Sequence, residues 1–288
     1  MSQRRPTDMS QPKVSVVLCN FNHSRYLERC FGGILTQTMP DWEIVLTEDG
    51  STDGSQDIIR SYASRDPRFK VNYFSTNRGP KEAYKDALSR ATGTYLYNGA
   101  CDDFVVNKNF FRAGVDVLDA NPAVSGFYGI AAIYSNEKEK ATGFMGSAET
   151  VGYNTPRQVC EGFLKCRSVV TTPSALWRHD AYHQYGGLHM EELFTALGPQ
   201  MDFYLSHALA LVTGVHYEKE LFACQRVFEV RTNYSANMNL WETARRFEEL
   251  ERRLRPLCPT YPDIEKDWAR WRAYWMVDVV QKSGVSLS

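Results

Sequence analysis

Two apolar runs that end in polar residues decide the fold: VSVVLCNFN at residues 14–22 and WEIVLTEDGS at residues 42–51. Short runs rich in Val, Ile and Leu are typical of buried strands, so we expect strands at Val14–Leu18 and Trp42–Leu46. Between them, apolar residues recur at helical spacing and predict an amphipathic helix: Tyr26, Leu27, Cys30, Phe31, Ile34 and Leu35. The order strand, helix, strand is typical of a parallel sheet with helices on its faces.

The same alternation continues along the chain. Further strands are expected at Lys70–Phe74 and Tyr95–Asn98, with a helix that begins at Pro80, because proline is favoured at the first helical position. Weaker patterns predict helices at Lys108–Ala120, Pro156–Lys165 and Asp202–Val212, and strands at Ser125–Tyr134, Val169–Trp177 and Leu221–Val227. The polar, glycine-containing stretch Ser135–Tyr153 is expected to be a mobile loop. The fold class predicted is α/β, with a mostly parallel central sheet flanked by helices and a C-terminal helical appendage.

Composition excludes several classes of protein. Hydrophobic residues make up 43% of the 288 residues, charged residues 23%, and the formal net charge is −1, which is ordinary for a globular domain. Because no run of Lys and Arg occurs, we expect no nucleic-acid partner. The seven cysteines are scattered without a Cys-x-x-Cys pair, so neither a disulfide framework nor a zinc site is indicated. No apolar run approaches the ~20 residues that span a bilayer, and a cytoplasmic enzyme is expected.

Three regions are expected along the chain. Residues 1–12 are polar and are predicted to be a disordered lead-in, not a signal peptide. Residues 13–235 form the main domain, with halves at 13–104 and 105–235. Residues 236–288 form a helical segment in which Trp268, Trp271, Trp275 and Val279 make one stripe. That stripe suits docking onto the protein's own body, a homodimer interface, or peripheral contact with the inner membrane face.

Polar clusters follow each of the four predicted strands. They are Cys19-Asn20-Phe21-Asn22, Glu48-Asp49-Gly50-Ser51, Asn77-Arg78-Gly79 and Cys101-Asp102-Asp103. Since open α/β sheets bind ligands at the carboxyl ends of their strands, we expect one site there. The adjacent carboxylates of Asp102 and Asp103 suit a hard divalent cation that bridges diphosphate oxygens. Glu48, at a strand end, offers a carboxylate that could accept an N–H from a nucleotide base.

Taken together, these segments resemble family 2 glycosyltransferases of the A-type fold (GT-A). Weaker matches lie at Tyr185–Leu188, Asp202–Leu205 and Leu221–Arg226. The resemblance implies transfer of a sugar from a nucleotide-diphospho-sugar to a hydroxyl of a glycan or other acceptor. The donor expected first is a UDP-sugar. It also implies inversion, a Mn²⁺ or Mg²⁺ cofactor, and a place in bacterial surface polysaccharide synthesis.

The resemblance also assigns roles to residues. It implies nucleotide contacts at Cys19, Asn20, Phe21, Asn22, Glu48, Arg78 and Asp102, and metal binding at Asp103 together with Asp102. It implies that Asp202 is the general base. Asp202 near a helix start also suits a simple N-cap, and Glu191 and Glu192 are reserve candidates for the base.

Three departures from the family pattern bear on the site. Cys19 stands where a proline is usual, Glu48 where an aspartate is usual, and Ala100 where many members have an extra aspartate. The departures at Cys19 and Glu48 leave the identity of the nucleotide base open. Two other functions are alternatives to a glycosyltransferase. One is a sugar nucleotidyltransferase, which requires a glycine-rich loop after the first strand, and the other is a non-catalytic nucleotide-sugar-binding module. Release of UDP from a UDP-sugar with Mn²⁺ separates a transferase from a binder.

Overall fold

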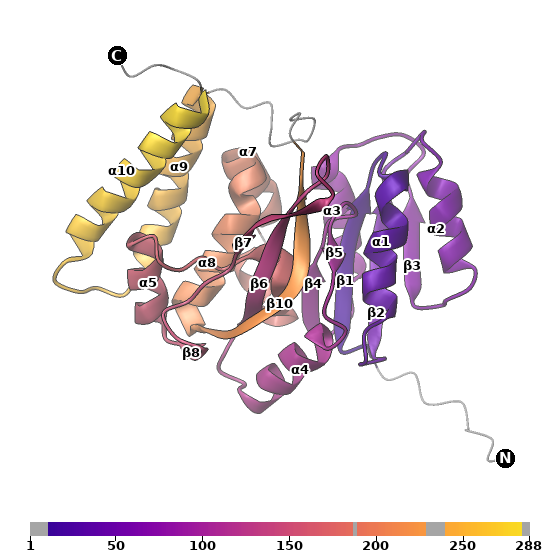
Figure 1. Cartoon of the computed structure of the whole chain (residues 1–288), viewed down its shortest axis with the longest axis horizontal. Helices are drawn as coiled ribbons and strands as arrows, with labels where there is room; N and C mark the ends of the chain where they lie inside the picture. The colour runs from indigo at the N-terminus through magenta and orange to yellow at the C-terminus, as the bar shows by residue number, and fades with distance from the viewer. Residues whose placement is uncertain (1–10, 187–188, 229–239, 284–288) are drawn as a thin grey trace.

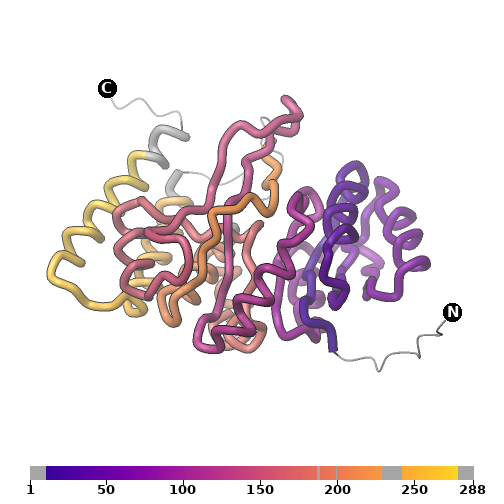
Figure 2. The backbone as a smooth tube through the Cα atoms, turned by 60° about the horizontal axis from the view of Figure 1, so that its bottom comes forward, coloured from indigo at the N-terminus to yellow at the C-terminus, as the bar shows by residue number. Residues whose placement is uncertain are grey.

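The computed structural model describes residues 11–186, 189–228 and 240–283. The expected disordered lead-in therefore lies almost wholly outside the described residues, as does the expected boundary between residues 235 and 236. Figure 1 shows a central sheet with helices on both faces, and the first strands and the last helices occupy opposite ends of the molecule, as Figure 2 shows from another side.

The first half of the sheet is parallel, as predicted. Its strands lie in the order β3-β2-β1-β4, with bounds Val14–Asn20 (β1), Trp42–Glu48 (β2), Phe69–Tyr73 (β3) and Tyr95–Asn98 (β4). The register of β1 and β2 places Asn20 opposite Glu48. The polar residues that follow these strands therefore meet at one edge of the sheet. The connecting helices are α1 (Ser24–Leu35), α2 (Ser55–Ala63) and α3 (Pro80–Arg90).

The second half of the sheet is mixed. The order continues β9-β6-β10-β5, and β9 runs antiparallel to both of its neighbours while β6 and β10 are parallel. The strands are β5 (Phe104–Val105), β6 (Gly126–Ser135), β9 (Ala175–Arg178) and β10 (Val215–Val227). The helices are α4 (Phe110–Ala120), α5 (Pro156–Leu164), α6 (His179–Tyr185), α7 (Met190–Leu197) and α8 (Met201–Thr213).

Strand β1 shows why its sequence is almost continuously apolar. Val14, Val16 and Leu18 face one core, together with α1, α2 and α4, while Val17 faces a second core that contains residues of α3, α5 and α8. A strand that is buried on both faces carries apolar residues at successive positions instead of alternating ones.

The polar stretch Ser135–Tyr153 is not the loop that its composition predicted. Within it, β7 (Lys140–Met145) pairs antiparallel with β6, and β8 (Gly152–Asn154) pairs with β10. All six β7 residues are exposed or half-buried on an edge of the sheet and lie outside the core. An edge strand of this kind needs no apolar alternation, so the sequence carries no strand signal there.

The C-terminal helices pack onto the body of the protein. Helices α9 (Leu240–Leu254) and α10 (Ile264–Ser283) lie beside α5 and α8 (Figure 1), and Trp268 and Trp271 are buried against Phe163 of α5. The tryptophan stripe therefore docks onto the protein's own body, which is one of the three interpretations that its sequence allowed. A homodimer through these helices and contact with a membrane stay predictions.

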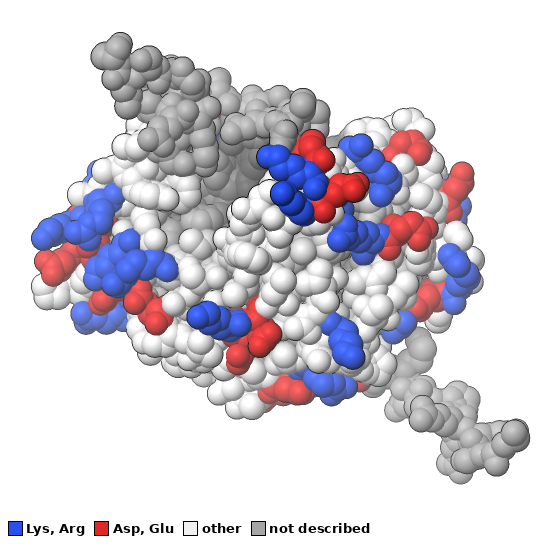
Figure 3. Space-filling model, in the orientation of Figure 1, with Lys and Arg blue, Asp and Glu red and all other residues white. Residues whose placement is uncertain are grey.

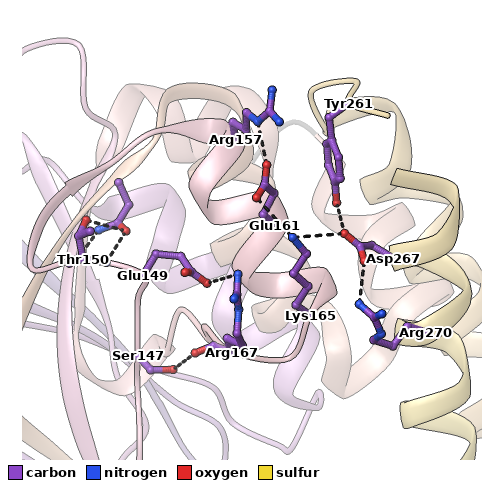
Figure 4. A network of polar contacts seen from close by, with 11 residues as sticks. Ser147, Glu149, Thr150, Arg157, Glu161, Lys165, Arg167, Tyr261, Asp267 and Arg270 are labelled. Atoms are coloured by element: carbon purple, nitrogen blue, oxygen red, sulfur yellow. Dashed lines mark hydrogen bonds and ion pairs between the residues drawn. The ribbon is translucent and has the colours of Figure 1, made fainter. Parts of the chain in front are cut away.

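A polar network reinforces this docking (Figure 4). The buried carboxylate of Asp267 on α10 accepts a hydrogen bond from the hydroxyl of Tyr261 at 2.9 Å and lies 3.6 Å from Nζ of Lys165, at the end of α5. Because a buried carboxylate is costly without partners, these contacts favour a single docked position. No helix among the described residues is long and apolar enough to cross a membrane. On the face drawn in Figure 3, acidic and basic side chains are intermixed.

Candidate active site

A cleft of about 500 Å³ lies at the carboxyl edge of the parallel strands. Its walls come from the segments that follow all four strands, together with the start of α3 and the end of the β10 segment. The lining residues are Cys19, Asn20, Phe21, Asn22, His23, Arg25, Tyr26, Asp49, Asn77, Pro80, Ala83, Asp102 and Phe228. The predicted cluster Cys19–Asn22 and Asp102 are therefore brought together, as the order of strands and helices required.

The hydroxyl of Ser51 joins the loop after β1 to the loop after β2. Its Oγ accepts hydrogen bonds from Nδ2 of Asn20 at 3.1 Å and from the backbone N–H of Asn22 at 3.0 Å. Oδ1 of Asn22 accepts in turn from the N–H of Thr52 at 2.9 Å. These bonds hold Asn22 in a left-handed conformation with φ 57°, which asparagine tolerates better than most residues.

Asp49 joins the loop after β2 to the loop after β3. Its two carboxylate oxygens accept from the backbone N–H groups of Arg78 at 2.7 Å and Gly79 at 2.9 Å. The two loops also approach closely at Gly50, which has φ +72°, and where a Cβ would lie 2.6 Å from the carbonyl carbon of Thr76. Only glycine fits both the conformation and the space.

Glu48 lies outside the wall where the sequence placed it. Its side chain is 0% exposed, and Oε1 accepts from the backbone N–H of Ser51 at 2.8 Å. It is therefore a buried turn residue in this structure, and the carboxylate that reaches the cleft is that of its neighbour Asp49. A nucleotide contact by Glu48 stays an untested prediction that this geometry does not favour.

Arg78 is also outside the lining of the cleft. Its guanidinium packs 4.2 Å from the ring centre of Phe74, and the residue is exposed. What Arg78 contributes in this structure is its backbone N–H, which binds Asp49. Its exposed side chain stays a candidate for the phosphates of a ligand.

The acidic pair after β4 is divided between two environments. Asp102 lines the cleft, whereas Asp103 is only 8% exposed and its Oδ1 accepts from the backbone N–H of Arg226 at 2.7 Å. Nε of Arg226 donates to the carbonyl of Asp102 at 2.9 Å, so Arg226 binds both residues of the pair. The side chain of Arg226 is half-buried, with its guanidinium 4.5 Å from the ring centre of Tyr26.

These residues fit a divalent cation that is held jointly with a ligand. Among the described residues, no group of three or more His, Cys, Asp or Glu side chains comes together that could hold a metal ion alone. Mg²⁺ commonly binds through one or two carboxylates and completes its shell with water and substrate phosphates, and Mn²⁺ also prefers oxygen ligands. Asp102 is the carboxylate of the pair that lines the cleft, whereas metal binding by Asp103 stays an untested prediction, because its Oδ1 is bound to the N–H of Arg226 in this structure.

Asp202 lies beside the cleft, at the second position of α8. The residue as a whole is exposed, while the protein packed around its carboxyl group removes enough water to raise the pKa of that group from 3.8 to about 6. The thiol of Cys19 has its pKa raised to about 12, first by burial and then by the negative charge of Asp202, followed by Asp49 and Asp102. Cys19 is therefore a neutral thiol that lies among the three carboxylates.

The reserve candidates for the general base, Glu191 and Glu192, form ion pairs with basic side chains. Glu191 is bound by Nζ of Lys81 at 2.6 Å and of Lys85 at 2.7 Å, which lower its pKa to about 2. Glu192 pairs with Arg253. In contrast, no described side chain donates a hydrogen bond to the carboxylate of Asp202, which leaves that carboxylate available.

Sequence reasoning missed a tyrosine pair next to Asp202. The hydroxyls of Tyr84 on α3 and Tyr182 on α6 lie 2.7 Å apart, and both are buried. Burial raises the pKa of both phenols, and the charge of Asp202 raises them further. Tyr84 falls within the helix predicted to begin at Pro80, and no signal in the sequence joins it to Tyr182, which lies 98 residues away.

Comparisons with known proteins show the family of the chain. The family described as Glycosyl transferase family 2 matches residues 15–182. Over 126 residues the chain is 32% identical to an uncharacterized glycosyltransferase of Nostoc sp., covering 44% of this chain and 39% of that protein. Over 86 residues it is 38% identical to the putative teichuronic acid biosynthesis glycosyltransferase TuaG of Bacillus subtilis, covering 30% and 34%. The matched part is thus well under half the length of these curated relatives.

Solved structures share the fold. S. aureus TarS in complex with UDP-GlcNAc aligns with a TM-score of 0.71 at 14% identity, covering 96% of this chain and 76% of that one. The mannosyltransferase PcManGT of Pyrobaculum calidifontis, in complex with GDP-Man and Mn²⁺, aligns with a TM-score of 0.56 at 16% identity, covering 96% and 77%. The expected α/β fold of the GT-A type is confirmed.

Proposed function

The chain belongs to glycosyl transferase family 2, and we propose from its site that it transfers a sugar from a nucleotide-diphospho-sugar to an acceptor hydroxyl. One observation carries the proposal. The cleft at the sheet edge is lined by one carboxylate of the acidic pair, Asp102, while a second carboxylate with a raised pKa, Asp202, is close enough to Cys19 of the same cleft for its charge to raise the pKa of that thiol. This arrangement provides separate groups for the leaving diphosphate and for the acceptor proton.

The donor we propose first is a UDP-sugar. TarS, which shares the fold, is described with UDP-GlcNAc, and the other neighbour with GDP-Man, so a guanosine donor is the second candidate. The wall of Cys19, Asn20, Phe21 and Asn22 would hold the nucleotide. Asp49 would keep the Asn77–Gly79 loop against the ligand.

A divalent cation, Mn²⁺ or Mg²⁺, would be held by Asp102 together with the diphosphate oxygens. When bound, it supplies positive charge that offsets the negative charge developing on the departing diphosphate. Asp103 would act indirectly, because its hydrogen bond to the N–H of Arg226 fixes the turn that presents Asp102 to the cleft.

The reaction we propose is one displacement that inverts the anomeric carbon. The acceptor oxygen bonds to that carbon as its bond to the diphosphate oxygen breaks, and the acceptor proton passes to a carboxylate oxygen of Asp202. A carboxylate with a pKa near 6 is a stronger base than an ordinary aspartate and is still ionised at neutral pH. Cys19 is a poor candidate for a nucleophile, because its raised pKa keeps it neutral.

The acceptor we propose is a hydroxyl of a growing glycan, in bacterial surface polysaccharide synthesis. The support is the name of the Bacillus subtilis relative, which concerns teichuronic acid biosynthesis. A cytoplasmic location and peripheral contact with the inner membrane face stay predictions from the sequence.

Nucleotide release tests the proposal. The purified chain is incubated with UDP-GlcNAc or GDP-mannose and Mn²⁺, and the nucleoside diphosphate that is freed as the sugar passes to an acceptor hydroxyl or to water is measured. Thermal unfolding is followed with UDP or GDP and Mn²⁺. We expect one diphosphate to raise the unfolding temperature, since it binds the folded state, and the matching donor to be turned over. A thermal shift without turnover would indicate a binding module, and pyrophosphate release from a nucleoside triphosphate and a sugar phosphate would indicate a nucleotidyltransferase.

A further inference from the structure

The C-terminal helix α9 reaches the segment that carries Asp202 through one buried arginine. Arg246 is 9% exposed, and its Nη1 donates to the backbone carbonyl of Leu197 at 3.2 Å. Leu197 is the last residue of α7, where the final carbonyls of a helix lack partners within the helix. The guanidinium therefore caps α7, and Glu242 on the same face of α9 binds Nη2 of Arg246.

The turn after α7 is shaped around this guanidinium. Gly198 has φ +51°, and a Cβ at this position would lie 1.6 Å from Nη1 of Arg246. No side chain fits at position 198, because the guanidinium of Arg246 occupies that space. Gly198 begins a short 3-10 turn, Gly198–Gln200, which leads directly into α8, and Asp202 is the second residue of that helix. Four residues thus separate the point that Arg246 contacts from the proposed base.

Asp202 depends on its backbone for its position. None of the described residues donates a hydrogen bond to its carboxylate, so its place beside the cleft follows from where the turn starts α8. Arg246, on helix α9, holds this turn in place. A buried guanidinium is an expensive way to dock a helix, because its Nε has no partner in the described structure and apolar packing would serve as well.

We propose that Arg246 is a positioning residue for the transfer reaction, which sets the Gly198–Gln200 turn and thereby holds Asp202 against the acceptor. The C-terminal helices are then part of the catalytic apparatus as well as of the core. This inference rests on the proposed function, since it assumes that Asp202 is the base.

Arg253 provides a matched control. It lies on the same helix α9 and binds the same helix α7, where its guanidinium pairs with Glu192, and its other ion-pair partner, Glu249, lies on α9 and not in the turn before Asp202. Loss of this ion pair loosens the docking of α9 on α7 without removing the group that shapes the turn.

The experiment compares the full-length variants Arg246→Met, Arg246→Lys and Arg253→Met with the wild type. Two quantities are measured: hydrogen exchange of backbone amides in residues 198–202, and nucleotide release from UDP-GlcNAc or GDP-mannose with Mn²⁺, next to the affinity for the free nucleotide. For Arg246→Met we expect faster exchange in the turn and turnover reduced on the order of 10- to 100-fold, because small misplacement of a catalytic group is costly. Nucleotide affinity should be unchanged, since the cleft is built from other segments.

The lysine variant keeps a donor that can reach the carbonyl of Leu197, so it should recover part of the lost turnover, and Arg253→Met should keep turnover close to the wild type. Equal loss of turnover in Arg246→Met and Arg253→Met, or unchanged exchange at residues 198–202, would overturn the proposal. If the wild type releases no nucleotide from either donor, the proposed function fails, and the exchange data still decide whether Arg246 holds the turn.

Discussion

Oδ1 of Asp103 accepts a hydrogen bond of 2.7 Å from the backbone N–H of Arg226, across 123 residues of sequence. This bond ties the end of β10 to the acidic turn after β4. It directs one carboxylate of the pair into the protein and leaves the other, Asp102, at the cleft. Adjacent residues of the same type therefore lie in different environments.

The first prediction concerns this division. Asp102→Asn should abolish the Mn²⁺-dependent part of nucleotide binding, because the carboxylate that faces the cleft loses its charge, while the unfolding temperature without ligand stays near the wild type. Asp103→Asn should instead lower the unfolding temperature, since it weakens the buried hydrogen bond to the N–H of Arg226, and a hydrogen bond of this kind is worth roughly 0.5–1.5 kcal/mol. Calorimetric titration with UDP, with and without Mn²⁺, and thermal unfolding separate the two. Normal cation dependence in Asp102→Asn would assign the cation to Asp103 alone.

The second prediction concerns the neighbours Glu48 and Asp49. Asp49→Asn should weaken nucleotide affinity roughly 10-fold, because an amide has one acceptor oxygen for the two N–H groups of Arg78 and Gly79, and charge-assisted bonds are worth about 1.5–3 kcal/mol. Glu48→Gln keeps an acceptor for the N–H of Ser51, so UDP affinity should hardly change. A larger loss in Glu48→Gln than in Asp49→Asn would return base recognition to Glu48.

The third prediction concerns the close approach at Gly50. Gly50→Ala should destabilise the protein by about 2 kcal/mol or more, because left-handed strain alone costs on the order of 1–3 kcal/mol and a methyl group would also meet the backbone of Thr76. Gly54→Ala is the control, since Gly54 also has positive φ but open space around its Cα. Urea denaturation of both variants gives the difference. Equal destabilisation would mean that the loop yields without cost.

The location of the site was predictable from the sequence, whereas the orientation of its residues was not. The strands β1 to β4 carry strong apolar patterns, and a parallel sheet brings their carboxyl ends together, so Cys19–Asn22 and Asp102 could be placed at one edge. Whether Glu48 or Asp49 faces the cleft depends on how the chain turns after β2. That turn is set by contacts with the loop after β3, which no local pattern records.

Long-range contacts account for the other omissions. Arg226 is joined to the acidic turn, Tyr84 to Tyr182, and Arg246 to the turn before Asp202, over separations of 123, 98 and 49 residues respectively. Each partner was visible only as a helix or strand residue of ordinary type. The packing of α9 and α10 creates the last of these contacts, and the tryptophan stripe predicted an apolar face without naming what it covers.

The fourth prediction concerns pH. A general base acts when it is deprotonated, and burial raises the pKa of Asp202 to about 6. Turnover should therefore be low at pH 5, rise as the pH increases through about 6, and level off above 7. The thiol of Cys19, with a pKa of about 12, does not titrate in this range. Nucleotide release is measured from pH 5 to 8 with nucleotide affinity checked at each point, and a flat profile at constant affinity would argue against a base with this pKa.

The transfer rate and donor affinity of Asp202→Asn, measured on one preparation, test the proposed base most directly. With whichever of UDP-GlcNAc and GDP-mannose the wild type turns over, we expect the rate to fall roughly 10²–10⁴-fold, the usual effect of losing a positioned proton acceptor. Affinity for nucleotide and Mn²⁺ should stay near the wild type, because Asp202 lies outside the lining of the cleft. If Asp202 only begins α8, asparagine would serve as well in that position, and rate, affinity and stability would all be preserved. A rate near that of the wild type would therefore contradict Asp202 as the base.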